Sequence, residues 1–322
     1  MLAYLGAAPR SEKWAVREMT KASLRYEFKA VEQCDMCGSP VEEHKVLGKR
    51  ANRSQGWSPQ QFRAVCTSVV QCERCHLIFA DPQPIPLDLQ DHYGVPPESY
   101  WKEEYFTVED AYFQDVVDRY NVLVGLRPGQ RALDIGAGLG KAMIALQRAG
   151  FDTYGFEPSK PFRERAIERM GISPDRLRLG DMQSMEYDTG QFHLITFGAV
   201  LEHLPDPSTS IAKALRWLAP GGVIHIEVPS SHWMISRIIN AGYRIRGLDY
   251  VGNISPMHSP YHLFEFSVDS FRLNGMRNGY SVAHHEQFVC QTYMPALFDP
   301  LLRWIMKRTA TGMQLSIWLR HA

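Results

Sequence analysis

The feature that most constrains the fold of this chain is a repeated alternation of apolar strand patterns and helical patterns across residues 131–229. Glycines end the helical patterns, as they commonly end real helices. Strands that alternate with helices in this way form a mostly parallel sheet that helices cover on both faces. The expected strands are 132–135, 153–156, 177–179, 193–197 and 223–228, and the expected helices are 139–149, 161–170 and 208–218.

The regions on either side of this repeat are expected to complete the same fold. A helical pattern at 108–124 stops at Arg127-Pro-Gly129, and we expect it to cap the sheet. The last third predicts helices at 268–278 and 296–306 and strands at 263–266, 281–289 and 313–319. The sequence therefore predicts a doubly wound, Rossmann-like α/β fold with an antiparallel terminal strand.

Composition indicates the class of protein and disfavours one class of partner. Hydrophobic residues make up 45% of the chain and charged residues 22%, the balance of a globular protein. Lys plus Arg equals Asp plus Glu at 35 each, so no overall positive field attracts a phosphate backbone. No segment approaches the apolar length of a membrane span, and the first residues do not form a signal-peptide pattern. We expect a cytoplasmic protein, as a monomer or homodimer, that does not bind nucleic acid.

A glycine-rich turn, Leu133-Asp-Ile-Gly-Ala-Gly-Leu-Gly140, joins the first expected strand of the repeat to its helix. Its G-x-G-x-G spacing differs from the dinucleotide fingerprint, and Asp134 would repel a pyrophosphate but suit a cationic ligand. Glu157 ends the next strand, where a carboxylate can accept hydrogen bonds from two ribose hydroxyls. Asp181 follows the third strand and could bind an adenine amino group. The turn alone would also fit an ordinary strand-to-helix connection.

These segments, followed by VLEHLPDP and LAPGGVIHIEVP, resemble the class I S-adenosylmethionine-dependent methyltransferases. The resemblance covers roughly a third of the chain and implies S-adenosylmethionine as the cofactor. One departure is His193, where the family often has Asp; we do not expect it to affect cofactor binding. The resemblance implies that Gly136 and Gly138 line the methionine portion, Glu157 binds the ribose, Asp181 and Met182 flank the adenine, and Phe197 with Gly198 closes over the cofactor.

Two C-x-x-C pairs, Cys34 with Cys37 and Cys72 with Cys75, predict a structural zinc site. This spacing lets two thiolates on a tight turn take adjacent corners of a tetrahedron, and four thiolates leave no open coordination position. The long gap between the pairs predicts a hairpin or loop insertion. Redox-active or merely buried cysteines are the alternative, and Cys66, His44 and His76 are possible substitute ligands. The two lone cysteines, Cys66 and Cys290, are expected to be packed thiols.

The arrangement also resembles the N-terminal zinc-binding domain of the sugar C-methyltransferases, including the flanking CGSP and the aromatic segment at 100–105. The downstream catalytic His and Tyr motifs of those enzymes are not recognisable in this chain. C-methylation of a keto sugar therefore does not carry over from the resemblance.

The acceptor site is expected at the carboxyl edge of the sheet, where open α/β folds bind ligands. Glu202 and His203 follow the fourth strand of the repeat. A histidine near the methyl group is the natural base, although a structural role for His203 fits equally well. In the segment 257–262, His258 is a second candidate base, and His262 is expected to be a loop residue with its hydrogen bonds satisfied.

The expected activity is methyl transfer to a small molecule, such as a sugar on a carrier or a natural-product intermediate, at a heteroatom. Two alternatives stay open: an RNA-modifying methyltransferase with a zinc module, and a non-catalytic S-adenosylmethionine-binding scaffold.

A proline-rich run at 81–86 marks the first domain boundary, because proline continues neither a helix nor a central strand.

The expected domains are 1–95, the zinc-binding module; 96–232, the cofactor-binding core; 233–262, a lid insertion over the acceptor site; and 263–322, the C-terminal part of the methyltransferase fold. Within the lid, an apolar and basic helical segment at 235–246 is expected to cover the pocket, with contact to lipid as the alternative.

Overall fold

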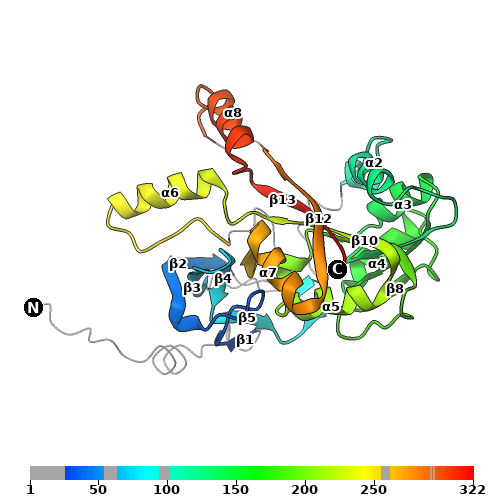
Figure 1. Cartoon of the computed structure of the whole chain (residues 1–322), viewed down its shortest axis with the longest axis horizontal. Coiled ribbons are helices and arrows are strands. Elements are labelled where there is room, and N and C mark those ends of the chain that lie inside the picture. Colours follow the sequence, from blue (N-terminus) through cyan, green and yellow to red (C-terminus); the bar gives the residue numbers. More distant parts are fainter. Residues whose placement is uncertain (1–25, 54–63, 94–101, 255–261, 291, 293) are drawn as a thin grey trace, which may run out of the picture.

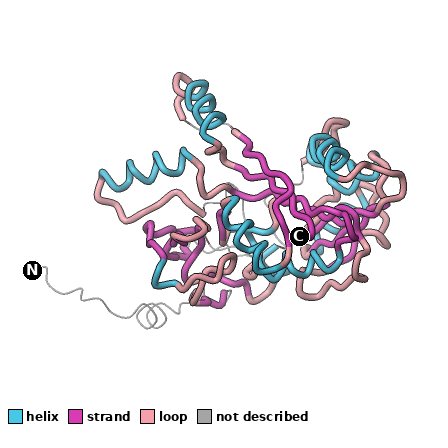
Figure 2. The backbone as a smooth tube through the Cα atoms, viewed as in Figure 1, coloured by secondary structure: helices cyan, strands magenta, loops and turns pink. Residues whose placement is uncertain are grey.

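A computed structural model describes residues 26–53, 64–93, 102–254, 262–290, 292 and 294–322. Its largest element is a central sheet, which lies beside a smaller, mostly N-terminal part (Figure 1). Figure 2 shows the helices gathered around the central strands, while two helices, α6 and α8, extend from the body. None of the described helices is both long enough and apolar enough to cross a lipid bilayer.

Seven strands from the described ranges form the central sheet in the order β12-β13-β10-β9-β6-β7-β8. The pairs from β10 through β8 are parallel, whereas β13 is antiparallel to both of its neighbours. The strands are β6 (Arg131–Ile135), β7 (Asp152–Glu157), β8 (Leu177–Leu179), β9 (Phe192–Gly198), β10 (Leu218–Pro229), β12 (Tyr280–Phe288) and β13 (Gln314–His321). This order confirms the predicted doubly wound fold with an antiparallel terminal strand.

The strand order reverses at β6, which lies between β7 and β9. Ligands of open α/β sheets bind at such a switch point, outside the carboxyl ends of the strands. The glycine-rich turn after β6 therefore lies where a ligand is expected. The α-helices after α1 (Leu89–Tyr93) are α2 (Gln114–Leu123), α3 (Lys141–Arg148), α4 (Lys160–Glu168), α5 (Pro207–Trp217) and α7 (Val268–Asn278), together with the two that extend from the body, α6 (Met234–Ile245) and α8 (Asp299–Thr309).

The core explains why the central strands have nearly continuous apolar sequences. Leu194, Ile195 and Phe197 of β9 are all fully buried, because helices cover both faces of a parallel strand in the middle of the sheet. Trp217 at the end of α5 packs its ring edge-on against Phe156 of β7. These contacts fix the carboxyl ends of β7 and β9, on which the cofactor-binding residues are expected.

The N-terminal part contributes a second, four-stranded sheet of described residues in the order β11-β4-β3-β2. β2 and β3, which lie where a hairpin or loop insertion was expected between the cysteine pairs, form an antiparallel pair. The remaining elements are β1 (Tyr26–Lys29), β2 (His44–Arg53), β3 (Ala64–Cys72), β4 (Ile78–Asp81), β5 (Gln83–Pro86), α1 (Leu89–Tyr93) and β11 (Phe264–Glu265). The pairing of β11 with β4 joins residues almost two hundred positions apart in the chain. The division into domains at residues 95, 232 and 262 stays a prediction.

Some element ends differ from those expected for identifiable reasons. Helix α8 starts at Asp299 rather than at 296, since Pro300 occupies its first turn, the position that proline favours. Helix α2 starts at Gln114 rather than at 108, because Phe113 before it has a left-handed backbone with φ 65°. After α6, the Lys49 N–H donates to the Asp249 carbonyl, and the Lys49 carbonyl accepts a hydrogen bond from the Val251 N–H, so residues 249–251 lie along β2.

Candidate functional site

The glycine-rich turn after β6, which we call the ledge, is open to a ligand at the switch point. Gly136 and Gly138 have φ values of 66° and 56°, in the left-handed region that favours glycine. A Cβ atom on Gly136 would lie 2.6 Å from a Val200 methyl carbon, whereas a Cβ on Gly138 would meet no atom within 4 Å. Gly198 at the end of β9 also faces open space by the same criterion. The backbone at Gly138 and Gly198 is therefore accessible to a ligand.

Glu157 at the end of β7 is tied to this ledge. One of its carboxylate oxygens accepts a hydrogen bond from the Gly138 N–H at 2.8 Å, and the other accepts one from the Ser159 N–H at 2.9 Å. The residue is only 6% exposed, and burial raises the pKa of its carboxyl to about 7. Each oxygen keeps one lone-pair direction, so the carboxylate can accept two further hydrogen bonds. Such a group fits the two hydroxyls of a ribose.

Asp134, on β6 just before the glycine-rich turn, also makes a hydrogen bond to a neighbouring strand. Its Oδ1 accepts a hydrogen bond of 2.7 Å from the Thr196 hydroxyl, which links β6 to β9. Burial raises the pKa of the Asp134 carboxyl to about 6. Burial, followed by the charges of Asp134 and Glu227, raises the pKa of Tyr112 to about 12. Two carboxyl groups thus lie near Tyr112, where a cationic ligand group would be stabilised.

The residues expected around the adenine and at the cofactor closure differ in their hydrogen bonding and in their exposure. Asp181 uses one oxygen, Oδ1, to accept hydrogen bonds from the Gln183 N–H, the Ser184 N–H and the Ser184 hydroxyl, at 2.8 to 3.0 Å. Met182 is 7% exposed, and Phe197 is fully buried in the core. Of the Phe197 and Gly198 pair, only Gly198 is exposed. The roles assigned to these residues in adenine binding and cofactor closure stay predictions.

Helix α1 lies against the cofactor side of the sheet. Its Tyr93 carbonyl accepts a hydrogen bond from the Ser159 hydroxyl at 3.0 Å, and the Gln90 side chain accepts one from the Lys160 N–H at 3.1 Å. Burial raises the pKa of Tyr93, and the charges of Glu157 and Glu202 add to the effect. Tyr93 therefore lies near both the expected ribose-binding acid and the expected acceptor side.

The acceptor candidates Glu202 and His203 lie on a short 3-10 helix, Leu201–His203, just after β9. The structure brings His262 to them: its ring centre is 4.9 Å from that of His203, and its Nε2 is 3.8 Å from Glu202 Oε1. Glu202 is 1% exposed, and burial raises the pKa of its carboxyl to about 8. The third candidate, His258, lies outside the described residues.

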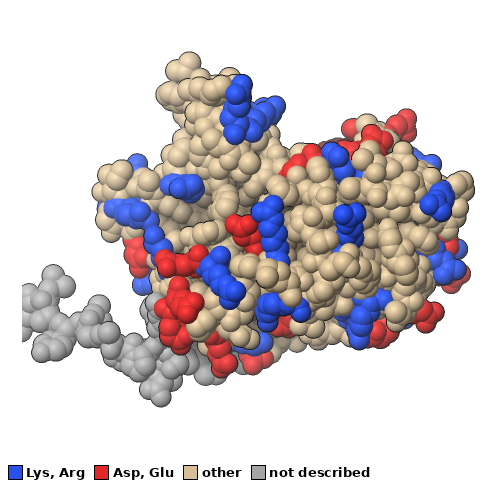
Figure 3. Space-filling model, in the orientation of Figure 1, with Lys and Arg blue, Asp and Glu red and all other residues tan. Residues whose placement is uncertain are grey.

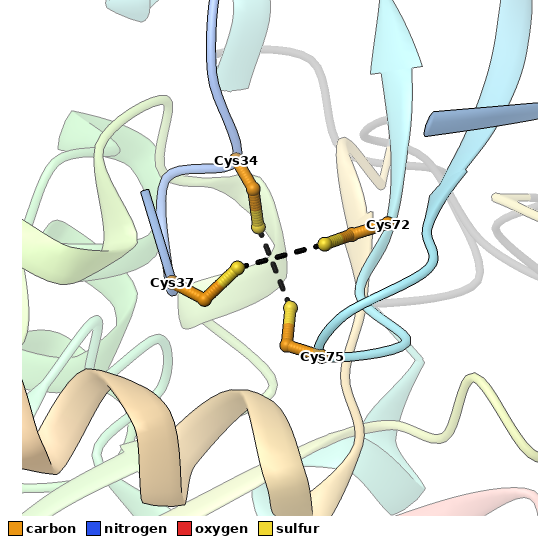
Figure 4. A group of neighbouring side chains, drawn as sticks. All are labelled: Cys34, Cys37, Cys72 and Cys75. Carbon is orange, nitrogen blue, oxygen red and sulfur yellow. Dashed lines mark hydrogen bonds between the residues drawn. The ribbon is translucent and has the colours of Figure 1, made fainter. Parts of the chain in front are cut away.

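The four cysteines predicted as zinc ligands lie together and are all buried. Their side chains point toward one another: Cys34 and Cys37 come from one turn, Cys72 from the end of β3 and Cys75 from the turn that follows it (Figure 4). The sulfurs of Cys34 and Cys75 are 3.4 Å apart, and those of Cys37 and Cys72 are 3.5 Å apart. In a tetrahedral site with zinc–sulfur distances of about 2.3 Å, neighbouring sulfurs are about 3.8 Å apart. The distances between the cysteine sulfurs are close to this value, so the donor set fits zinc.

The substitute ligands lie away from the four sulfurs or contact them indirectly. Cys66 is exposed. His44 Nε2 lies 3.1 Å from the Ser39 hydroxyl, and that hydroxyl lies 3.1 Å from Cys72 Sγ. Because Ser39 stands between them, His44 is placed to orient a ligand rather than to act as one.

The cysteine turns are anchored to helices of the main domain. The carboxylate of Asp35, between Cys34 and Cys37, accepts a hydrogen bond of 2.7 Å from the Ser208 N–H at the start of α5. Asn274 of α7 donates to the Met36 carbonyl at 2.9 Å, and the Ser267 hydroxyl donates to the Cys75 carbonyl. The geometry of the cysteine cluster is therefore coupled to helices α5 and α7.

The comparison with known families decides what kind of domain carries this site. A family described as a methyltransferase domain matches residues 108–285, more than half of the chain. The chain belongs to this methyltransferase family. The match contains the glycine-rich turn, Glu157 and the Glu202–His203 pair, and it confirms the resemblance inferred from the sequence.

Several curated proteins are similar to part of this methyltransferase-family chain. A ubiquinone biosynthesis O-methyltransferase of Methylococcus capsulatus is 28% identical over 123 residues, which are 37% of this chain and 52% of the relative. A 27-O-demethylrifamycin SV methyltransferase of Amycolatopsis mediterranei is 33% identical over 128 residues, which are 38% of this chain and 47% of the relative. The chain spans about half the length of the curated relatives that it matches.

Among solved structures, an S-adenosylmethionine-dependent methyltransferase from Clostridium acetobutylicum has a TM-score of 0.47 and 12% identity, covering 70% of this chain and 97% of that one. Another, from Mesorhizobium loti, has a TM-score of 0.45 and 16% identity, covering 66% and 98%.

His193, the departure from the family pattern, lies at the opposite edge of the sheet from the ledge. It lines a pocket of about 540 Å³ together with Arg127 and Pro220. Its Nδ1 accepts a hydrogen bond from the Arg131 N–H at 3.2 Å, at the start of β6. Since β6 runs from this edge to the glycine-rich turn, His193 is separated from the cofactor side by the length of the strand.

Three residues of this methyltransferase domain and its neighbourhood were missed or discounted by sequence reasoning. Tyr93 lies in a short helix with no motif around it. Glu227 pairs with Gly198 across β9 and β10, and its place at a strand end in IHIEVP could have identified it. His262 was expected to be an ordinary loop residue, because only the folded chain brings it beside His203.

Proposed function

We propose that this chain transfers a methyl group from S-adenosylmethionine to a hydroxyl of a small-molecule or carrier-linked acceptor, such as a sugar or a natural-product intermediate. The observation that carries the proposal is the buried Glu157 carboxylate, hydrogen-bonded to the open Gly138 ledge at the topological switch point. The family match supports it, because residues 108–285 contain both groups.

In this proposal each half of the cofactor has its own protein groups. The ribose hydroxyls donate to the Glu157 oxygens, which already hold the Gly138 and Ser159 N–H groups in place. Asp134 and Glu227 supply negative charge for the methionine ammonium group. Asp181 and Met182 flank the adenine, and the open backbone at Gly198 approaches the sulfonium.

The chemical step is an in-line displacement at the methyl carbon. An oxygen lone pair of the acceptor forms the new O–C bond, the C–S bond breaks, and its electrons stay on sulfur, giving S-adenosylhomocysteine. The enzyme gains most from positioning the two reactants and from removing the hydroxyl proton. In this proposal His203, which follows Glu202 after β9 on the same edge as Gly198, receives that proton.

Oxygen is the proposed acceptor atom because two of the similar proteins are named for O-methylation or for an O-demethylated substrate. A small molecule is favoured over RNA by the equal numbers of acidic and basic residues. On the face shown in Figure 3, the two kinds of charge are interspersed rather than gathered into one basic surface.

We further propose that Cys34, Cys37, Cys72 and Cys75 bind one structural zinc. All four donors are cysteines, so no coordination position is left for substrate chemistry. The zinc would stabilise the turns that contact α5 and α7 and thereby the main domain.

Calorimetric titration with S-adenosylhomocysteine tests the cofactor assignment. Binding by the wild-type protein, and its loss in Glu157→Ala with an unchanged circular dichroism spectrum, would support the proposal. No binding by the folded, zinc-loaded wild-type protein would overturn it. Binding without turnover on any acceptor would instead favour the non-catalytic scaffold.

A further inference from the structure

We propose that Glu202, His203 and His262 form a second metal site, which holds a divalent transition-metal cation on the acceptor side of the cofactor. One ligand atom from each residue lies within 4.8 Å of the others. The residues come from two segments: Leu201–His203 after β9, and the residue two positions before β11. The role of this cation in catalysis rests on the proposed methyl transfer, but its binding does not.

The backbone holds the two segments in register. The Leu263 N–H donates a 2.7 Å hydrogen bond to the Glu202 carbonyl, so His262 is fixed directly beside Glu202. Its Nε2 is 3.8 Å from Glu202 Oε1. A cation about 2.1 Å from each donor requires donor separations of roughly 3.0 to 3.5 Å. Side-chain rotations that draw the donors together by about an ångström would complete the coordination.

The Glu202 carboxylate gives an independent reason to expect a cation. The residue is 1% exposed, and its Oε2 has no hydrogen-bond partner among the described residues. A buried carboxylate oxygen without a partner is unfavourable unless it is neutralised or coordinated. A cation held between Glu202 and the two imidazoles would supply that missing partner.

The donor set indicates the kind of metal and the kind of site. Two imidazoles and one carboxylate suit divalent transition metals such as Zn²⁺, Fe²⁺ or Co²⁺, in contrast to the four thiolates of the cysteine cluster. Three protein ligands leave at least one coordination position open, as in catalytic rather than structural sites. His262 is 22% exposed, so that position can be reached from solvent.

The site lies near the proposed cofactor. Glu202 and His203 follow β9, whose last residue, Gly198, has a backbone open to a ligand. An acceptor hydroxyl bound at the open position would lie at the same edge of the sheet as the proposed methyl group. The cation lowers the pKa of the bound hydroxyl, whose proton leaves to water, and the resulting oxygen lone pair attacks the methyl carbon. In this case His203 acts as a ligand rather than as the base.

The test is calorimetric titration of the full, zinc-loaded chain with Co²⁺. Absorption spectra recorded in parallel detect exchange into the cysteine cluster, which would produce an intense thiolate charge-transfer band. We expect one further Co²⁺ per chain without that band, and at least a tenfold weaker affinity in Glu202→Gln and in His262→Ala. His284→Ala is the matched control, because His284 lies on β12 and pairs with Glu286. It should bind Co²⁺ like the wild type.

S-adenosylhomocysteine affinity, measured on the same samples, separates the two proposals and checks folding. Retained cofactor affinity in Glu202→Gln and His262→Ala, with loss of Co²⁺ binding, supports the site. Absence of the additional Co²⁺ in the wild type, or unchanged Co²⁺ affinity in both variants, would overturn it. Co²⁺ binding in a wild type that does not bind S-adenosylhomocysteine would keep the metal site and reject the proposed function.

Discussion

Replacing Glu157 should weaken cofactor binding strongly and change its dependence on pH. The Glu157 carboxylate is 6% exposed and is placed to accept hydrogen bonds from two ribose hydroxyls. Each hydrogen bond to a charged group contributes about 1.5 to 3 kcal/mol before compensation. Glu157→Ala also leaves the Gly138 and Ser159 N–H groups without their carboxylate partner. Even with water as a replacement partner for these groups, we expect the affinity for S-adenosylhomocysteine to fall at least tenfold, equivalent to about 1.4 kcal/mol.

The pH dependence follows from burial, which raises the pKa of Glu157 to about 7 in the cofactor-free protein. The ribose hydroxyls bind best to the ionised form, so affinity is full above pH 7 and falls as pH decreases through that value. The decrease approaches a limit of about tenfold for each pH unit. Glu157→Gln should bind weakly and lose this dependence, whereas the exposed-site control Glu164→Gln should behave like the wild type.

Calorimetric titrations with S-adenosylhomocysteine between pH 5.5 and about 8.5 measure both effects. The same dissociation constant in folded Glu157→Ala and wild type would refute the cofactor pose. So would an identical pH profile in Glu157→Gln and wild type, since the titrating group would then lie elsewhere.

Three further predictions concern the metal and the core. Cys34→Ser combined with Cys37→Ser should remove zinc and lower the melting temperature, and elemental analysis that still finds one zinc per chain would contradict the assignment. Phe197→Ala should lower the free energy of unfolding by about 3 to 5 kcal/mol, because the ring is fully buried, and denaturant unfolding measures this loss. Burial raises the pKa values of Glu227 and Glu265 to about 7 from 4.5, so these groups bind protons in the folded state that the unfolded chain has released. Their contribution to stability is therefore lost as pH rises from about 4.5 through 7. Because burial lowers the pKa of His92 and His225 to about 3, which has the opposite effect on stability, the test compares the wild type with Glu265→Gln. The same pH dependence of the melting temperature in both proteins would contradict the prediction.

Local sequence signals predicted elements whose boundaries are encoded by a few neighbouring residues. Helix α7 occupies the expected 268–278, because Ser267 and Ser270 form a capping box at its start and Gly279 ends it with a left-handed backbone. The cysteine pairs predicted their cluster for the same reason, since each C-x-x-C turn presets two of the four donors.

Contacts between distant segments could not be predicted from the same signals. The pairing of β11 with β4 depends on the path of the whole chain, and so does the approach of His262 to Glu202. The contact of α1 with the turn after β7 is also set by tertiary packing, through the Ser159 hydrogen bond to Tyr93. The sequence thus identified the glycines and acids that lie at the switch point, together with Glu202 and His203, but not the approach of His262 and Tyr93 to them.

The most direct test of the account is to follow an isotopically labelled methyl group. Zinc-loaded protein would be incubated with methyl-labelled S-adenosylmethionine and a cell extract, whose small molecules and RNA are then separated and analysed by mass spectrometry. We predict label on an oxygen of a small molecule or carrier-linked metabolite, together with release of S-adenosylhomocysteine, and no transfer by Glu157→Ala. Label found only in RNA, or no transfer by a wild-type protein that binds the cofactor, would contradict the proposed function.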